Sequence, residues 1–196
     1  YADTTPLREY LDTERGTLPD LPAIVLRELA QQGRGDDDDA KSEELNADGT
    51  IDSERTGKLI ELARPLEVTF HRAFDVTADP FRSLDELIKL DVDRLLTSGQ
   101  EPSVLEGVEL IAELVRRAGE DIIIMPGAGI TPKNLPRIIR ETGAREYHVT
   151  GSSSVDSKME FRNDRCFMGK ALYPPEFSMK VADAGKISHY VQLLND

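Results

Sequence analysis

The sequence predicts an α/β fold: a TIM-barrel-like (β/α) arrangement that is only partial, with about four parallel β/α units preceded by N-terminal helices. Short apolar and β-branched runs recur through the middle of the chain, and amphipathic segments separate them. Strands that alternate with helical patterns of about 10–15 residues indicate β-α-β units and a parallel sheet. The expected strands are Val68–Phe70, Arg94–Leu96, Ile122–Met125 and Tyr147–Thr150.

We divide the chain into an irregular or helical N-terminal segment, residues 1–49, and the partial barrel, residues 50–196. Apolar residues at helical spacing predict a helix in the first segment. They are Leu21, Ile24, Val25 and Leu29, with Gly33 as the stop. Four adjacent aspartates, Asp36–Asp39, follow. Such a run is able to attract a divalent cation, but we favour a solvated acidic loop.

Capping signals define the helices of the barrel segment. The first expected helix covers 52–63 after the Asp48-Gly49 turn, and the last covers 186–194. The three helices between them are expected to start at Asp79 with Pro80, at Ser103 with Glu106, and at Thr131 with Pro132. Ser103 and Glu106 have the spacing of a capping box, in which each side chain satisfies a backbone amide of the first turn. Gly119 and Gly143 are the expected stops of the third and fourth helices.

Composition excludes several classes of function. Lys+Arg 24 and Asp+Glu 37 give a net charge of −13, and such a surface repels nucleic acid and anionic lipid. No apolar run approaches the roughly 20 residues of a membrane span. The lone cysteine, Cys166, excludes an intrachain disulfide framework and suits a reducing compartment. We therefore expect a soluble, intracellular protein without nucleic-acid or membrane partners.

Polar residues after the first strand are the candidate catalytic group. His71, Arg72 and Asp75 place an imidazole, a guanidinium and a carboxylate within five residues of one another. Such groups at a strand end are able to bind an anion and move a proton, with His71 as the acid or base. The alternative is structural: Arg72 pairs with Asp75 and locks the loop.

Glycine and hydroxyl residues after the next three strands are the candidate anion site. Barrel enzymes build phosphate cups from the loops after their last two strands, where glycines allow close approach of backbone amides. The expected ligands are Ser98 after the second strand, Gly127, Gly129 and Thr131 after the third, and Thr150, Gly151 and Ser152 after the fourth. Ordinary tight turns are the alternative, because a lone Gly-x-Gly is weak and the third glycine of the dinucleotide fingerprint is missing.

Sulfur residues near the C-terminus suggest a metal. Cys166 and Met168, with Met159 nearby, offer the soft ligands that Cu(I) prefers. The more common role of methionine and cysteine is to fill a core. His148 is expected in the core and His189 on the surface.

Several motifs resemble the CutC copper homeostasis family. They are Val68-Thr69-Phe70-His71-Arg72-Ala73-Phe74-Asp75, Leu96-Thr97-Ser98-Gly99, Met125-Pro126-Gly127-Ala128-Gly129-Ile130-Thr131 and Met159-Glu160-Phe161-Arg162-Asn163. The match runs from about Leu45 to Val191. The resemblance implies a (β/α) barrel, a cytoplasmic location, homo-oligomers and a role in copper handling, without an agreed reaction.

Two departures from the family pattern matter. Members have four further strand–helix units in a first half, where copper is associated with cysteines, but residues 1–44 show neither such strands nor a cysteine. The family's copper ligands therefore do not transfer to this chain. Ala128 also stands in a loop that is usually all glycine, and its methyl group is tolerable unless the residue needs a positive φ.

Four parallel strands alone leave two open edges and an exposed inner face. There are three explanations. The chain is a fragment or an isoform, a partner chain covers the open side, or the N-terminal helices cover it. We favour the fragment or isoform and the partner chain over the N-terminal helices. Three functions follow as hypotheses. The first is a CutC-like role in copper homeostasis, with copper bound. The second is an enzyme for a small phosphorylated or anionic metabolite. The third is a non-catalytic subunit that uses its open barrel face for protein interaction.

Overall fold

The structure is a computed structural model, and it describes residues 24–25, 45–163, 165 and 177–195. These residues form two compact units. The first extends to Ile130 and resumes over Arg137–Val149, and the second comprises Thr131–Pro136 and the residues from Thr150 onward. The predicted domain division at residue 49 stays a prediction, because most of residues 1–49 lies outside the described part. The acidic run Asp36–Asp39 also lies outside it.

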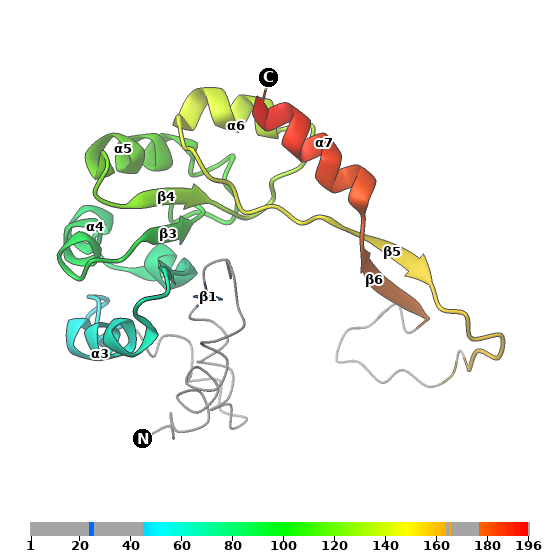
Figure 1. Cartoon of the computed structure of the whole chain (residues 1–196), viewed down its shortest axis with the longest axis horizontal. Helices are drawn as coiled ribbons and strands as arrows, with labels where there is room; N and C mark the ends of the chain where they lie inside the picture. The colour runs from blue at the N-terminus through cyan, green and yellow to red at the C-terminus, as the bar shows by residue number, and fades with distance from the viewer. Residues whose placement is uncertain (1–23, 26–44, 164, 166–176, 196) are drawn as a thin grey trace. The chain divides into compact units, whose positions relative to one another are not determined.

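A parallel sheet forms the centre of the first unit (Figure 1). Its strands, in spatial order, are β1 (Ile24–Val25), β2 (Val68–Phe70), β3 (Arg94–Thr97) and β4 (Ile123–Pro126), and each pairs in parallel with the next. One parallel bridge, between Gly127 and His148, extends the pairing beyond β4. The predicted mixed α/β class with parallel strands is confirmed, and the described strands form an open sheet rather than a closed barrel.

Two predicted elements are wrong in type or extent. Ile24 and Val25 form a strand, so the helix predicted over 21–29 fails at these two residues; the rest of that range lies outside the described part. Adjacent β-branched residues favour a strand once a partner is present, and β2 supplies that partner. The strand predicted at Tyr147–Thr150 is reduced to the bridge at His148, because only Gly127 pairs with it among the described residues.

The register of the sheet determines which side chains enter the core. Phe70 pairs with Leu95, and Leu95 pairs with Ile124, so the three share one face of the sheet, and all three are buried. Helices α3 (Ser53–Ala63), α4 (Pro80–Lys89) and α5 (Val108–Ala118) lie along one side of this sheet in Figure 1. They contribute the buried side chains Ile60, Leu84, Leu87, Ile111 and Leu114. Each such burial is worth about 1.5–3 kcal/mol.

Capping residues start two helices where the sequence predicts. Asp52 accepts a hydrogen bond from the amide of Arg55 (3.0 Å) at the start of α3. Asp79 accepts from Phe81 (2.9 Å) and Arg82 (3.1 Å) at the start of α4, which has Pro80 in its first position. These contacts satisfy amides that have no partner within the helix.

The starts of two other helices differ from prediction. α5 begins at Val108, with Gly107 at its cap, and Ser103–Glu106 forms a turn before it. Ser103 Oγ donates to Glu106 Oε1 (2.8 Å), so the two side chains bond to each other and do not cap the helix. Likewise, α6 (Leu135–Thr142) begins after a turn at Pro132–Asn134. Both turns extend the loops that follow β3 and β4.

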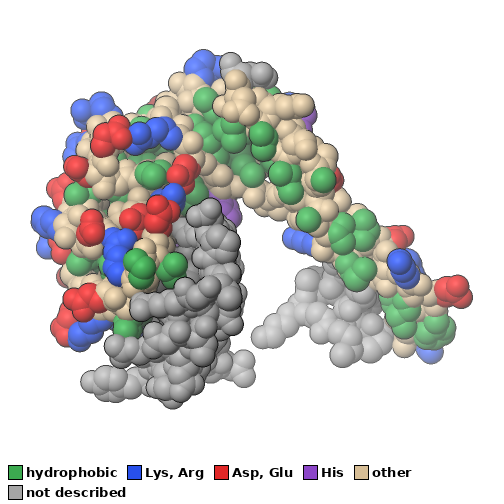
Figure 2. Space-filling view, in the orientation of Figure 1, with side chains coloured by type: hydrophobic (Ala, Val, Ile, Leu, Met, Phe, Trp, Pro, Cys, Tyr) green, Lys and Arg blue, Asp and Glu red, His purple; other side chains and the backbone are tan. Residues whose placement is uncertain are grey.

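The second unit consists of a hairpin and a helix. β5 (Ser152–Asp156) pairs antiparallel with β6 (Ser178–Ala182), and α7 (Ala184–Asn195) follows, which confirms the predicted closing helix. Apolar side chains are exposed along both parts, and Figure 2 shows those of the hairpin. They are Val155, Met179, Val181, Ile187, Val191 and Leu194. Within the described part of the chain, no helix is both long and apolar enough to span a bilayer.

Candidate functional site

Hydrogen bonds join the loops at the carboxyl edge of the parallel sheet. The loop after β2 opens into η1, a short 3-10 helix over Arg72–Val76. Arg72 Nη2 donates to the carbonyl of Glu101 in the loop after β3 (3.4 Å). That loop in turn reaches the loop after β4, because the amide of Val104 donates to the carbonyl of Ala128 (3.1 Å). The three loops therefore form one connected rim at the edge where parallel α/β proteins bind ligands.

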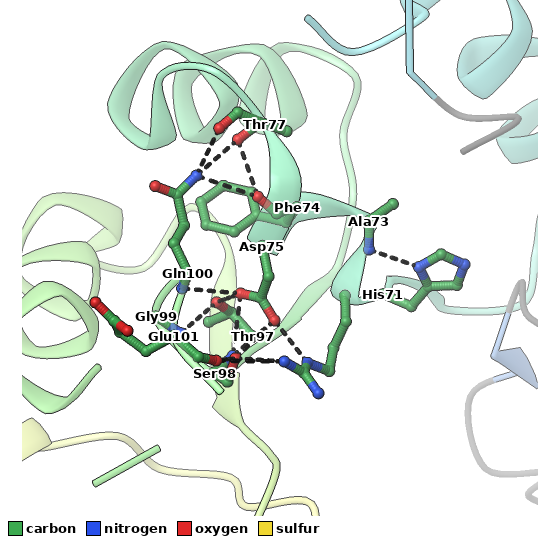
Figure 3. Close-up of polar contacts among 11 residues, drawn as sticks. His71, Ala73, Phe74, Asp75, Thr77, Thr97, Ser98, Gly99, Gln100 and Glu101 are labelled. Carbon is green, nitrogen blue, oxygen red and sulfur yellow. Dashed lines mark hydrogen bonds and ion pairs between the residues drawn. The ribbon is translucent and has the colours of Figure 1, made fainter. Parts of the chain in front are cut away.

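The carboxylate of Asp75 lies at the centre of this rim (Figure 3). Its side chain is only 6% exposed. Oδ1 accepts from the amides of Ser98 (3.1 Å) and Gln100 (3.2 Å) and from the hydroxyl of Thr97. Oδ2 accepts from the amide (3.0 Å) and hydroxyl (2.9 Å) of Ser98 and from Arg72 Nε (2.6 Å). We call Asp75, Arg72, Thr97, Ser98 and Gln100 the Asp75 cluster.

This arrangement joins two loops. Donors surround both oxygens of Asp75, and all of them except Arg72 come from residues 97–100 after β3. The hydroxyl of Ser98 has a single proton and two acceptors within reach, Asp75 Oδ2 and the carbonyl of Glu101. Buried polar groups satisfied in this way give a rigid structure. Asp75 and Ser98 thus hold the loops after β2 and β3 together.

Arg72 forms an ion pair with Asp75, which is the structural role that the sequence analysis gave as the alternative to catalysis. The Nε to Oδ2 distance is 2.6 Å, and Nη2 also donates to Ser98 Oγ (2.7 Å). The side chain of Arg72 is nevertheless 44% exposed, in contrast to its buried counter-ion. Arg72 therefore presents a positive charge to solvent while its inner edge is held in place. A catalytic role for His71, Arg72 and Asp75 stays a prediction.

His71 caps η1 with its ring. Its Nδ1 accepts a hydrogen bond from the amide of Ala73 (3.0 Å), which Figure 3 also shows. An Nδ1 that accepts from an amide assigns the proton of the neutral ring to Nε2. In this tautomer His71 is a hydrogen-bond donor at Nε2. Service as a base at Nε2 requires the other tautomer, which breaks the cap.

Thr97 and Gln100 of the cluster were not predicted as site residues. Gln100 has a left-handed φ of +58°, and its side-chain amide donates to the carbonyl (2.9 Å) and hydroxyl (3.1 Å) of Thr77. Thr97 is fully buried, and its hydroxyl accepts from the amide of Gly99 (2.9 Å). Gly99 signals a turn at this point, but nothing local identifies Thr77 or Asp75 as the partner of these residues.

The loop after β4 is shaped by close packing at Gly127 and by a positive φ at Ala128. A Cβ on Gly127 would lie 2.5 Å from Leu96 Cδ1 and 2.9 Å from His148 Cβ, so close packing requires glycine there. Ala128 has a φ of +125°. This positive φ is a conformation that glycine adopts more easily than alanine. The methyl group of Ala128 was expected to be costly if the residue needed such a φ, and it does. His148 is exposed, so its predicted place in the core is wrong.

Gly129, in the same loop, has a φ of +73°, and the other four predicted anion ligands belong to the second unit. Thr131 and Asn134 cap the turn before α6 reciprocally, since each side chain accepts from the other's amide. Gly151 lies against α7, where a Cβ would be 2.6 Å from Ile187 Cγ1. Ser152 lies in β5, opposite Ala182, so it belongs to a strand and not to the loop predicted after the fourth strand. Thr150 is exposed. Anion binding by these residues stays a prediction.

The predicted copper ligands are only partly visible. Met159 is described, and 56% of the residue is exposed. Cys166 and Met168 lie outside the described residues. Across the described ranges, no group of three or more His, Cys, Asp or Glu side chains is placed to hold a metal ion.

Comparison with known proteins gives consistent matches to one family. The model of the CutC family matches residues 40–153. A CutC family protein of Parabacteroides distasonis is 49% identical over 147 residues, which are 75% of this chain and 60% of that protein. The copper homeostasis protein cutC homologs of mouse (49%) and human (47%) match over 143 residues. Those residues are 73% of this chain and 53% and 52% of the two homologs.

A solved structure agrees with these matches. The crystal structure of a CutC protein from Streptococcus agalactiae superposes with a TM-score of 0.50 at 34% identity. The superposition covers 53% of this chain and 51% of the other. The chain thus spans about half to three-fifths of the length of the relatives it matches.

Proposed function

The chain belongs to the CutC family, and from this premise we propose that it acts in copper homeostasis and binds Cu(I) as cargo. The identity of 47% and 49% to the human and mouse copper homeostasis homologs is the observation that supports this role most directly. The chain spans only part of those proteins. We therefore propose the role in copper homeostasis for this chain and carry over no other property of the homologs.

The proposed Cu(I) ligands are the sulfur atoms of Met159, Cys166 and Met168. Thioether and thiolate sulfur are the soft ligands that Cu(I) prefers over carboxylate oxygen. Met159 supports the proposal, because its exposed side chain is accessible to an incoming ion. Within the described part of the chain, the His, Cys, Asp and Glu residues do not form a competing site.

A competition titration tests the ligand assignment. The protein is titrated with Cu(I) under reducing conditions against a chromogenic Cu(I) chelator, and the bound fraction is read from the chelator's absorbance. We expect one Cu(I) per chain, and loss of this binding in the double variant Cys166→Ser, Met168→Leu. Met179→Leu is the matched control, because Met179 is an exposed methionine (52%) of the same unit that is not among the proposed ligands.

The outcomes separate the two parts of the proposal. Absence of stoichiometric Cu(I) binding by the unmodified protein contradicts copper binding itself. Binding that survives in the double variant contradicts the sulfur ligands but leaves copper binding standing. Equal losses in the double variant and in Met179→Leu point to general damage from methionine replacement, and also contradict the assignment.

We also propose that the open sheet is part of a (β/α) barrel that a second chain completes. The outer edges of the described sheet support this, because β1 and the segment around His148 each pair on one side only within the described residues. Unpaired parallel edges favour association. The cytoplasm is the proposed location of this assembly, because a lone cysteine suits a reducing compartment. Light scattering coupled to gel filtration tests the assembly, and a monodisperse monomer contradicts it.

A further inference from the structure

We propose that Arg72 is the recognition group of an oxyanion site at the carboxyl edge of β2 and β3, which takes a small ligand bearing a carboxylate or a phosphate. This inference is independent of the copper proposal, because it uses none of the sulfur residues. It rests on the way in which the Asp75 cluster holds the guanidinium.

The buried carboxylate does not depend on Arg72 for its stability. Asp75 already accepts from three uncharged donors, namely the hydroxyl of Thr97 and the amides of Ser98 and Gln100, and the hydroxyl of Ser98, whose proton Glu101 also attracts, is a fourth within reach. These donors reach both oxygens of the carboxylate, so its hydrogen-bonding capacity is met without a counter-ion. The contact at 2.6 Å between Arg72 and Asp75 therefore orients Arg72 more than it neutralises Asp75.

The orientation leaves part of the guanidinium available. Nε bonds to Asp75, and Nη2 bonds to Ser98 Oγ and the carbonyl of Glu101. Nη1 has no hydrogen-bond partner in the described part of the chain, and the side chain is 44% exposed. A planar guanidinium fixed along one edge presents its free N–H groups in a defined direction. This geometry suits an oxyanion, which guanidinium groups bind through paired hydrogen bonds.

The surroundings make such a site specific. The chain carries a net charge of −13, so its general surface repels anions. Arg72 lies on the connected rim formed by the loops after β2, β3 and β4, and the bonds from Arg72 to Glu101 and from Val104 to Ala128 hold that rim. A recognition group on a rigid frame loses little conformational freedom when a ligand binds.

The test is calorimetric titration of the full chain with inorganic phosphate and, separately, with succinate. We expect saturable binding of at least one of them with one site per chain, and a loss of about tenfold or more in affinity in Arg72→Gln, since a hydrogen bond to a charged group is worth about 1.5–3 kcal/mol. Arg145→Gln is the matched control. It removes the same charge from an exposed arginine that pairs with Glu120 (2.8 Å), and we expect a change within about twofold.

A second measurement does not depend on the variant folding. In amide NMR spectra of the unmodified protein, the same titrations are expected to shift the resonances of Ser98 and Gln100, whose amides contact Asp75. Binding of phosphate alone, of succinate alone, or of both supports the proposal and identifies the ligand class. Absence of saturable binding by both probes, equal losses in Arg72→Gln and Arg145→Gln, or shifts that spare Ser98 and Gln100 would overturn it.

Discussion

Arg94 and Arg72 lie at opposite edges of the same parallel sheet, and the protein surrounds them differently. Arg94 begins β3. Its Nε and Nη2 donate to Glu146 (2.6 and 3.2 Å), and its Nη1 donates to Glu67. Its side chain is 15% exposed, and the hydrogen bond to Glu146 raises the pKa of Arg94 above its already high ordinary value. Arg72 has one carboxylate partner and an unused nitrogen within the described residues.

The difference separates an arginine enclosed by its own chain from one with N–H groups open to solvent. Glu67 precedes β2 and Glu146 precedes the bridge at His148, so Arg94 ties together the starts of three chain segments. Three of the five N–H groups of Arg94 bond to carboxylates of its own chain and its side chain is only 15% exposed, so little of this guanidinium is available to a ligand. In parallel α/β proteins, the amino edge generally serves stability and the carboxyl edge serves function. The two arginines follow this division.

Replacement of Asp75 by Asn gives the largest expected effect. The amide nitrogen of Asn would face donors that now point at a carboxylate, and several buried N–H and O–H groups would lose their acceptor. We expect the free energy of unfolding to fall by about 3 kcal/mol. Urea denaturation followed by circular dichroism measures it. In the control Asp79→Asn, the new residue caps α4 equally well, and we expect a change below about 0.5 kcal/mol.

The contrast between the two arginines is tested by replacing each with Met. Arg94→Met leaves Glu67 and Glu146 without their shared partner, and we expect a loss of about 2 kcal/mol, because both carboxylates are partly solvated. Arg72→Met leaves Asp75 with its uncharged donors, and we expect a loss below about 1 kcal/mol. The same urea denaturation compares them. Equal losses, or a larger loss for Arg72, contradict the division between the edges.

Elements set by local patterns were predictable from the sequence. α4 follows from Asp79, Pro80 and the apolar residues after them, and β2 and β3 follow from short apolar runs. β1 was predicted as a helix, because Ile24-Val25 is a strand only in the presence of β2, which lies more than 40 residues away. Ser152 was predicted in a loop for the same reason, since it pairs with Ala182 of a strand about 30 residues away. Non-local pairing decided both.

In the candidate site as well, contacts between residues close in sequence were predictable and contacts between distant residues were not. The Arg72–Asp75 pair was foreseen, because the two residues are three apart. The donors from Thr97, Ser98 and Gln100 were not, because the chain brings them to Asp75 only through the parallel pairing of β2 with β3. An anion-ligand role of Ser98 stays a prediction, and the structure adds that its hydroxyl and amide both contact Asp75. Sequence reasoning therefore found the location of the cluster but not its internal bonds.

Backbone strain at the carboxyl edge predicts a stabilising substitution. Ala128 has a φ of +125°, which glycine adopts at much lower cost, and we expect Ala128→Gly to raise the free energy of unfolding by about 1 kcal/mol. Ala112→Gly is the control within α5, where glycine lowers helix stability and we expect a loss of about 1 kcal/mol. Thermal unfolding of the two variants gives opposite signs. A loss in both variants means that the methyl group of Ala128 contributes contacts that outweigh the strain.

The amino edge gives the smallest effect, which depends on pH. The hydroxyl of Tyr147 donates to the carbonyl of Ala144 (2.6 Å), and burial raises the pKa of Tyr147 above 10. The neutral phenol therefore contributes stability that is fully present below pH 10 and is lost as the pH rises through the folded-state pKa, because the unfolded chain ionises first. Tyr147→Phe removes this titration. We expect it to cost about 1 kcal/mol or less at pH 7, and to make stability fall less steeply above pH 10 than in the unmodified protein. Parallel urea titrations at pH 7 and above pH 10 measure both quantities, and identical slopes would mean that Glu146 and Arg94 hold this segment without help from the tyrosine.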